Sequence, residues 1–127
     1  MRIVKTYARL FVTDLDHSLP LYERIVGRAA DLRFAFERAE LAAVGDFLLI
    51  AGPPEHTDRY RATVGPVIVD DLGELITELA EAGAELIDGP HTSATGRFAY
   101  LRHPDGVTVE YVQWATEVRS RVLGRPA

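Results

Sequence analysis

The apolar positions of this sequence alternate between a period typical of strands and a period typical of helices. Residues 6–12 are rich in β-branched and aromatic side chains, which predicts a strand. A helix is predicted to follow over 15–26, because its apolar side chains recur at spacings of four, three and four. Asp14 is the expected N-cap of this helix, and Gly27 is expected to end it. The apolar face of the predicted helix consists of Leu15, Leu19, Tyr22 and Val26.

Three short apolar segments come after the first predicted helix. They cover 32–38, 40–44 and 47–51, and turn residues such as Gly45 separate them, so each predicts a strand. The polar and proline-bearing stretch 52–61 is interpreted as a linker. The first half of the chain therefore predicts one helix and about four strands.

The second half repeats this order of elements. A strand is predicted over 64–69, Asp71 is the expected helix N-cap, and Gly83 is the expected end of the helix. Asp71 follows Asp14 by 57 positions (71 minus 14), an offset that also aligns the apolar faces of the two helices and indicates a weak internal repeat. The apolar face of the second helix consists of Leu72, Leu75, Ile76 and Leu79.

Three further strands are predicted over 84–87, 97–102 and 107–114. The last two are joined by 103–106, whose Pro-Asp-Gly is a tight-turn signal and predicts a hairpin. A short helix is expected in the charged tail, 116–127.

The length of 127 residues suits one domain. We expect a first module at about 1–57, a second module at about 58–115 and the C-terminal tail at 116–127. Apolar runs are short and broken by charges, and the N-terminus has no secretory pattern, so we expect a cytoplasmic protein with no membrane partner.

Composition excludes several classes of chemistry. The formal net charge of −5 opposes binding to the phosphate backbone, so nucleic acid is not expected as a partner. The absence of cysteine excludes disulfides, thiolate nucleophiles and cysteine-ligated zinc, and leaves histidine and carboxylate metal sites to be considered.

Four sequence segments carry a resemblance to a known family. They are Leu-Phe-Val-Thr-Asp-Leu at 10–15, Ser-Leu-Pro-Leu-Tyr-Glu at 18–23, Val-Ile-Val-Asp-Asp-Leu at 67–72 and His-Pro-Asp-Gly-Val-Thr-Val-Glu at 103–110. The chain resembles the vicinal oxygen chelate superfamily, which includes glyoxalases, bleomycin resistance proteins and extradiol dioxygenases. The resemblance implies an α+β fold in which two tandem βαβββ modules form a curved mixed sheet around a cavity. It also implies a homodimer.

Strand alternation then sorts the side chains that face this cavity. Ala8, Leu10 and Val12 are expected to pack under the first helix, so their neighbours face the other way. A slip of one residue would invert every such assignment. The predicted ligand-binding residues are Tyr7, Arg9, Phe36, Phe47, Val64, Phe98, Tyr100, Arg102, Glu110 and Trp114.

The resemblance also locates four positions where metal-dependent relatives carry His, Gln or Glu ligands. In this sequence they fall on Tyr7, near Leu49, on Val64 and on Glu110, and of these Glu110 alone is a usual ligand. Catalytic metal sites generally use about three protein ligands. We therefore expect no metal cofactor, which argues against metal-dependent lyase or dioxygenase chemistry.

Glu110 is the sole candidate for a catalytic group. A carboxylate facing a partly apolar cavity is expected either to pair with Arg9 or Arg102 or to carry a raised pKa. The histidines have no metal-binding spacing and are expected to be exposed or to cap turns. They are His17, His56, His91 and His103, of which the last two retain a place at the cavity rim as an alternative.

Three functional hypotheses remain open. The first, which we favour, is a protein that binds a small hydrophobic or cationic molecule without metal and sequesters an antibiotic or metabolite. The second is a metal-dependent lyase or dioxygenase of the same superfamily. The third is a structural or regulatory dimer with no ligand.

Overall fold

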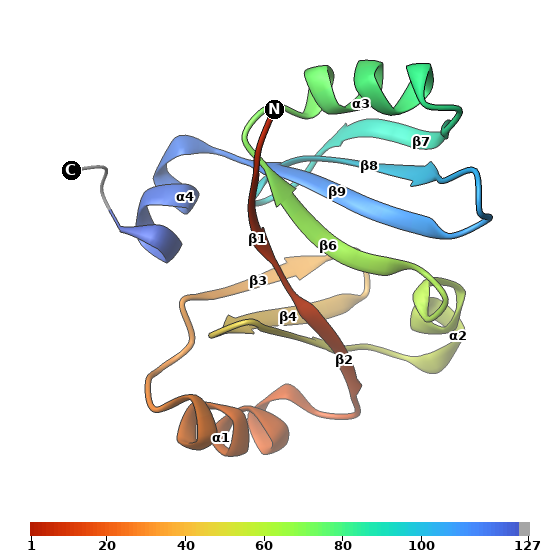
Figure 1. The fold of residues 1–127 in the computed structure, drawn as a ribbon. Helices are drawn as coiled ribbons and strands as arrows, with labels where there is room; N and C mark the ends of the chain where they lie inside the picture. Colours follow the sequence, from red (N-terminus) through yellow and green to blue (C-terminus); the bar gives the residue numbers. More distant parts are fainter. Residues whose placement is uncertain (125–127) are drawn as a thin grey trace. The chain divides into compact units, whose positions relative to one another are not determined.

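The computed structural model describes residues 1–124, which divide into two compact units (Figure 1). One unit is Tyr7–Arg61, and the other combines Met1–Thr6 with the residues from Ala62 on. Each unit contains one βαβββ module, as the family resemblance implied, and the fold class is α+β with mixed sheets. No helix in the described residues is long and apolar enough to cross a membrane.

The Tyr7–Arg61 unit contains a four-stranded sheet in the order β2-β5-β4-β3. β2 and β5 are parallel, and the other neighbours are antiparallel. The elements are β2 (Ala8–Val12), α1 (Leu15–Val26), β3 (Leu32–Phe36), β4 (Ala39–Val44), β5 (Phe47–Ala51), α2 (Pro54–Thr57) and the 3₁₀ helix η1 (Asp58–Tyr60).

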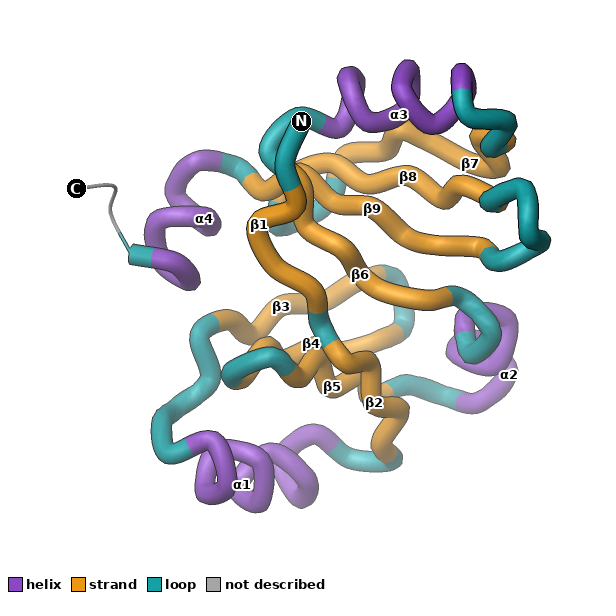
Figure 2. The backbone as a smooth tube through the Cα atoms, viewed as in Figure 1, coloured by secondary structure: helices purple, strands orange, loops and turns teal. Residues whose placement is uncertain are grey.

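α1 begins and ends where the sequence predicted. The carboxylate of Asp14 accepts a hydrogen bond from the Asp16 amide at 3.1 Å, which satisfies one free N–H of the first turn. Gly27 ends the helix at φ +87°, a conformation that glycine adopts without a Cβ clash. α1 packs along one face of its sheet (Figure 2). The buried cluster under it consists of Leu15, Leu19, Ala42, Val44, Leu49 and Ala51.

The second unit contains a five-stranded sheet in the order β1-β6-β9-β8-β7. β6 and β9 are parallel, and the other pairs are antiparallel. The elements are β1 (Ile3–Thr6), β6 (Val64–Val69), α3 (Leu72–Glu81), β7 (Glu85–Thr92), β8 (Gly96–Arg102), β9 (Thr108–Trp114) and α4 (Thr116–Leu123).

α3 covers one face of this second sheet (Figure 1). Asp71 caps the helix by accepting from the Glu74 amide at 2.9 Å, and the Gln113 side chain accepts from the Leu72 amide at 2.8 Å. Two N–H donors of the first turn are thus satisfied. The buried cluster under α3 consists of Val67, Val69, Leu72, Leu75, Ala99, Leu101, Val109 and Tyr111.

The structure differs from the sequence predictions in three local respects. The predicted strand 6–12 is divided at Tyr7, and a strand that the sequence did not reveal, β1, pairs with β6 in the five-stranded sheet. The predicted linker 52–61 contains α2 and η1. The expected tail helix is present as α4, and residues 125–127 of that tail lie outside the described residues.

Candidate functional site

Several predicted ligand-binding residues lie together on one face of the β6-β9-β8-β7 sheet. Ala99, Leu101, Val109 and Tyr111 pack under α3, so the alternate residues of β8 and β9 point to the opposite face. Five residues of this opposite face are relevant to binding, and we refer to them together as the aromatic face. It consists of His91, Phe98, Tyr100, Glu110 and Trp114.

The geometry of the aromatic face follows from strand register. Tyr100 on β8 lies directly opposite Glu110 on β9. The Phe98 and Tyr100 rings meet edge to face with centroids 5.8 Å apart, and the His91 ring lies 5.5 Å from that of Phe98. Both distances fall in the range of favourable aromatic pairs. A carboxylate therefore borders a short row of aromatic rings.

Burial distinguishes a floor from an accessible part of this face. Phe98 and Trp114 are buried, with exposed fractions of 7% and 8%, whereas Tyr100 and Glu110 are half-buried. Of these four side chains, the tyrosine and the carboxylate thus present the most surface.

Each of the two arginines expected near Glu110 makes a contact with another residue. Arg102 Nη1 lies 3.4 Å from Glu85 Oε2, and both side chains are largely exposed. Arg9 Nη1 donates to the Tyr60 carbonyl at 3.2 Å within its own unit. Each arginine therefore has a local role that the sequence did not indicate.

His91 brings a second titratable group to the aromatic face. Its Nε2 lies 2.7 Å from Asp88 Oδ1, and both side chains are about half exposed. The exposure agrees with the expectation for this histidine, whereas its carboxylate partner was not predicted. The sequence segment that could have indicated the Asp88–His91 pair is Asp88-Gly89-Pro90-His91. The pairing of β7 with β8 shifts register within this segment, which brings the first and the fourth side chain together.

The structure corrects the predicted position of Phe47, one of the predicted ligand-binding residues in the Tyr7–Arg61 unit. Phe47 packs against the α1 cluster, with its ring 5.3 Å from that of Tyr22, and not on the face that carries Arg9. The reason is register, because β2 is parallel to β5 and Phe47 pairs with Ala8 on the helix-facing side. Phe36 is half-buried on β3, opposite Ala39 of β4.

Three of the four family ligand positions carry side chains that do not suit a divalent metal. Burial, followed by the carboxylates of Asp31 and Asp46, raises the pKa of the Tyr7 phenol, which disfavours the phenolate that a metal would need. Leu49 is fully buried in the α1 cluster, and its neighbours Leu48 and Ile50 on the other face of β5 are also apolar. Val64 is apolar and exposed. Residues 1–124 contain no group of three or more His, Asp or Glu side chains arranged to hold a metal ion.

Two other histidines differ from the expectation of exposure or turn capping. His56, placed in a linker by the sequence, is buried at 7% exposure, with Nε2 3.4 Å from Glu37 Oε2 and Nδ1 3.4 Å from Arg59 Nη2. His103 is half-buried, and its Nε2 lies 2.8 Å from the hydroxyl of Tyr111. His17 is exposed on α1, as expected.

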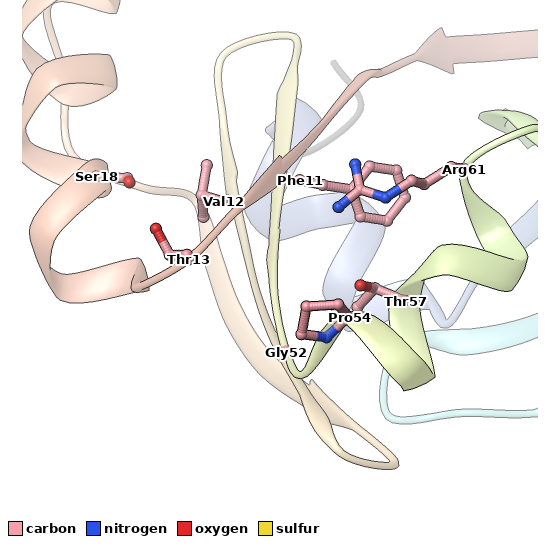
Figure 3. Close-up of a pocket in the computed structure, with 8 residues that line it drawn as sticks. All are labelled: Phe11, Val12, Thr13, Ser18, Gly52, Pro54, Thr57 and Arg61. Carbon is pink, nitrogen blue, oxygen red and sulfur yellow. The ribbon is translucent and has the colours of Figure 1, made fainter.

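A pocket of about 350 Å³ lies within the Tyr7–Arg61 unit, where β2 ends. Figure 3 shows the Arg61 guanidinium stacked across the Phe11 ring, with the Thr13 and Ser18 hydroxyls on the α1 side of β2. Sequence reasoning did not find this pocket, because its walls come from three separate segments. Its lining consists of Phe11, Val12, Thr13, Ser18, Gly52, Pro54, Thr57 and Arg61.

A family model matches most of the chain. Residues 4–111 match the model of the Glyoxalase/Bleomycin resistance protein/Dioxygenase superfamily. No curated protein sequence matches this chain.

Solved structures resemble the chain over nearly its whole length. A hypothetical, uncharacterized protein from Methanosarcina mazei is 39% identical, with a TM-score of 0.85 over 91% of this chain and 95% of that one. Methylmalonyl-CoA epimerase from Mycobacterium tuberculosis is 18% identical, with a TM-score of 0.70 over 93% of each chain. The Streptomyces coelicolor methylmalonyl-CoA epimerase in complex with 2-nitronate-propionyl-CoA is 17% identical, with a TM-score of 0.65 over 91% of this chain and 96% of that one. At these low identities the two epimerases show a shared fold.

Proposed function

Because this chain belongs to the Glyoxalase/Bleomycin resistance protein/Dioxygenase superfamily, we propose that it binds a small hydrophobic or cationic molecule on the aromatic face without a metal ion. The observation that carries this proposal is the cross-strand pair of Tyr100 and Glu110, beside the ring of Phe98. The biological role of such a protein would be to sequester an antibiotic or metabolite.

The chemistry of the aromatic face favours a flat ligand with a positive charge. Aromatic rings bind flat molecules through area and shape, and their electron-rich faces attract cations. A carboxylate at the border of the rings adds an opposite charge in a partly desolvated place. Tyr100 and Glu110 are half-buried, so a ligand can contact both.

The proposal needs no metal because the ligand would be held by these groups alone. The residues at the family ligand positions support this proposal. Tyr7 favours its protonated form, and the side chains of Leu49 and Val64 have no atom that can bind a metal. The second hypothesis, a metal-dependent lyase or dioxygenase, requires ligands that these positions do not supply.

We also propose that the protein is a cytoplasmic homodimer. Leu21 and Ile25 lie one turn apart on α1 and are 57% and 61% exposed. Adjacent exposed apolar side chains of this kind support association between copies. Sedimentation velocity across a range of concentrations would measure the assembly.

The binding proposal is tested by titrating the protein with berberine, a planar aromatic cation, after exhaustive dialysis against EDTA. Trp114 is the sole tryptophan of the chain and belongs to the aromatic face, so quenching of its emission reports binding there. The matched variants are Glu110→Gln, which removes the charge at constant shape, and Glu81→Gln, which removes an exposed charge on α3.

We expect saturable quenching of the Trp114 emission. Glu110→Gln should lower the affinity for berberine by about tenfold, because the contact between one carboxylate and a cation contributes about that factor. Glu81→Gln should leave the affinity unchanged. Dialysis against Mn²⁺, Zn²⁺, Fe²⁺ or Ni²⁺ should not strengthen binding. Stoichiometric metal that is lost in Glu110→Gln would refute the proposal in favour of an enzyme, as would deuterium incorporation into methylmalonyl-CoA in D₂O. Equal quenching in both variants would refute the role of Glu110.

A further inference from the structure

The pocket at the end of β2 is built from residues that the proposed function does not use. We propose that it is a second site, which binds a small molecule through a carboxylate or phosphate group, with Arg61 as the anchoring cation. This proposal is independent of binding on the aromatic face.

Arg61 is held in place by two contacts. Its Nε donates to Asp58 Oδ1 at 2.8 Å, and its guanidinium carbon lies 4.7 Å from the centroid of the Phe11 ring. A flexible side chain that is already oriented loses less entropy when a ligand binds. Among the described residues this guanidinium donates its hydrogen bond through Nε, which leaves the Nη1 and Nη2 edge for the two oxygens of a carboxylate or phosphate.

The segment that supplies Arg61 is itself fixed to the turn between β3 and β4. Arg59 Nη2 lies 3.0 Å from Glu37 Oε2 and 3.4 Å from His56 Nδ1. An arginine can only donate, so Nδ1 of this buried histidine accepts, and its Nε2 then faces Glu37 Oε2 at 3.4 Å. A further pair joins Arg38 to Glu55 at 3.4 Å. The wall of the pocket formed by Pro54, Thr57 and Arg61 is therefore preorganised.

The opposite end of the pocket offers neutral hydrogen-bonding groups. Figure 3 shows the hydroxyls of Thr13 and Ser18 on the α1 side of β2, away from Arg61. Val12, Gly52 and Pro54 form apolar surface in the same lining. The volume of about 350 Å³ is at the small end of ligand sites. The lining therefore fits a compact metabolite with an anionic end at Arg61 and a hydroxyl or carbonyl group at the other end.

Local hydrogen bonding, and not long-range attraction, has to provide the affinity. The chain carries a net charge of −5, and Asp58 offsets the charge of Arg61. A guanidinium edge can still bind an oxyanion in two parallel hydrogen bonds, which are directional and stronger than neutral ones. Lysine has no such edge, so Arg61→Lys should lose binding although it keeps the charge.

The test is a two-dimensional amide NMR titration of the full chain with sodium malonate or inorganic phosphate, against sodium chloride at matched ionic strength. The reporters are the amides of Ser18, Gly52 and Thr57. Arg61→Gln and Arg61→Lys are compared with Arg28→Gln. Arg28 is a matched control because it also pairs with an aspartate three positions away, Asp31, and its side chain is 55% exposed against 53% for Arg61.

We expect saturable shifts at the pocket amides with at least one of the two anions, weakened tenfold or more in both Arg61 variants and unchanged in Arg28→Gln. Saturation by malonate alone assigns a carboxylate ligand, and saturation by phosphate alone assigns a ligand with a phosphate group. The proposal is overturned by shifts that chloride reproduces, by shifts that do not saturate, or by equal affinity in Arg61→Gln. A failure here leaves the berberine result unaffected, because the two sites share no residue.

Discussion

Replacing Gly96 by alanine should strongly destabilise the unit that carries the aromatic face. Gly96 begins β8 opposite Trp114 and has a φ of +150°. A Cβ built there would overlap the Gln113 carbonyl oxygen, and it would lie 2.8 Å from the Ala115 nitrogen and 3.0 Å from Trp114 Cα. These neighbours are backbone atoms, so β9 has to move for alanine to fit.

The magnitude follows from two contributions. A positive φ costs alanine about 1 kcal/mol relative to glycine. The displacement of β9 also weakens two hydrogen bonds. One is the β8–β9 strand-pairing bond at Trp114, and the other is the 2.8 Å bond from the Ala115 amide to the Thr95 carbonyl. Each costs about 1 kcal/mol of stability. The sum is about 3 kcal/mol, which corresponds to a fall in Tm of roughly 10 °C for a chain of this size.

Gly106→Ala is the matched control for this substitution. Gly106 also has a positive φ, +91°, but a Cβ there would have no atom within 4 Å. It should lose about 1 kcal/mol from backbone strain alone. Urea unfolding followed by Trp114 fluorescence and by far-ultraviolet circular dichroism measures both variants. Equal losses in the two variants would refute the steric reasoning.

Two further predictions concern the dependence of stability on pH. The Arg2 amide, which donates to Asp70 Oδ1 at 2.7 Å, holds the pKa of that carboxyl below its usual value, and the N-terminal amine adds to this effect. The stability that this lowered pKa gives the folded state is present above the unfolded pKa of about 4, and it is lost as the pH falls further. The urea midpoint of Asp70→Asn should therefore decline less on acidification than that of the wild type. Parallel profiles of the two proteins would contradict this prediction. Burial raises the pKa of the Tyr7 phenol. The resulting stability is complete below the unfolded pKa of about 10 and is lost at higher pH, so Tyr7→Phe should flatten the alkaline decline of the urea midpoint, and an unchanged decline would disprove the effect.

Local sequence signals predicted the elements well where one short segment contains all the determinants. α1 has its N-cap at Asp14, its apolar period and its terminal Gly27 within fourteen consecutive residues (14–27), and the predicted bounds hold. The same reasoning located α3 and the hairpin of β8 and β9. Alternation along these two strands also placed Phe98, Tyr100, Glu110 and Trp114 on the face away from α3.

Register between segments was less accessible to sequence reasoning. Phe47 was assigned to the ligand-binding face, but its pairing with Ala8 across parallel strands puts it under α1. In a short strand whose residues are all apolar, both faces are apolar, so alternation does not indicate which side chain points to which face. The pairing with the neighbouring strand decides this.

The sequence by itself determined the order of elements and the α+β class, since each depends on residues close together in the chain. It also placed residues other than usual metal ligands at three of the four positions that the family resemblance implies. The tertiary structure decided which distant residues meet. It joined β1 to β6, buried His56 between Glu37 and Arg59, and set Arg61 across Phe11. Such contacts depend on how strands register and where a connecting segment folds back, and neither leaves a periodic pattern in the sequence.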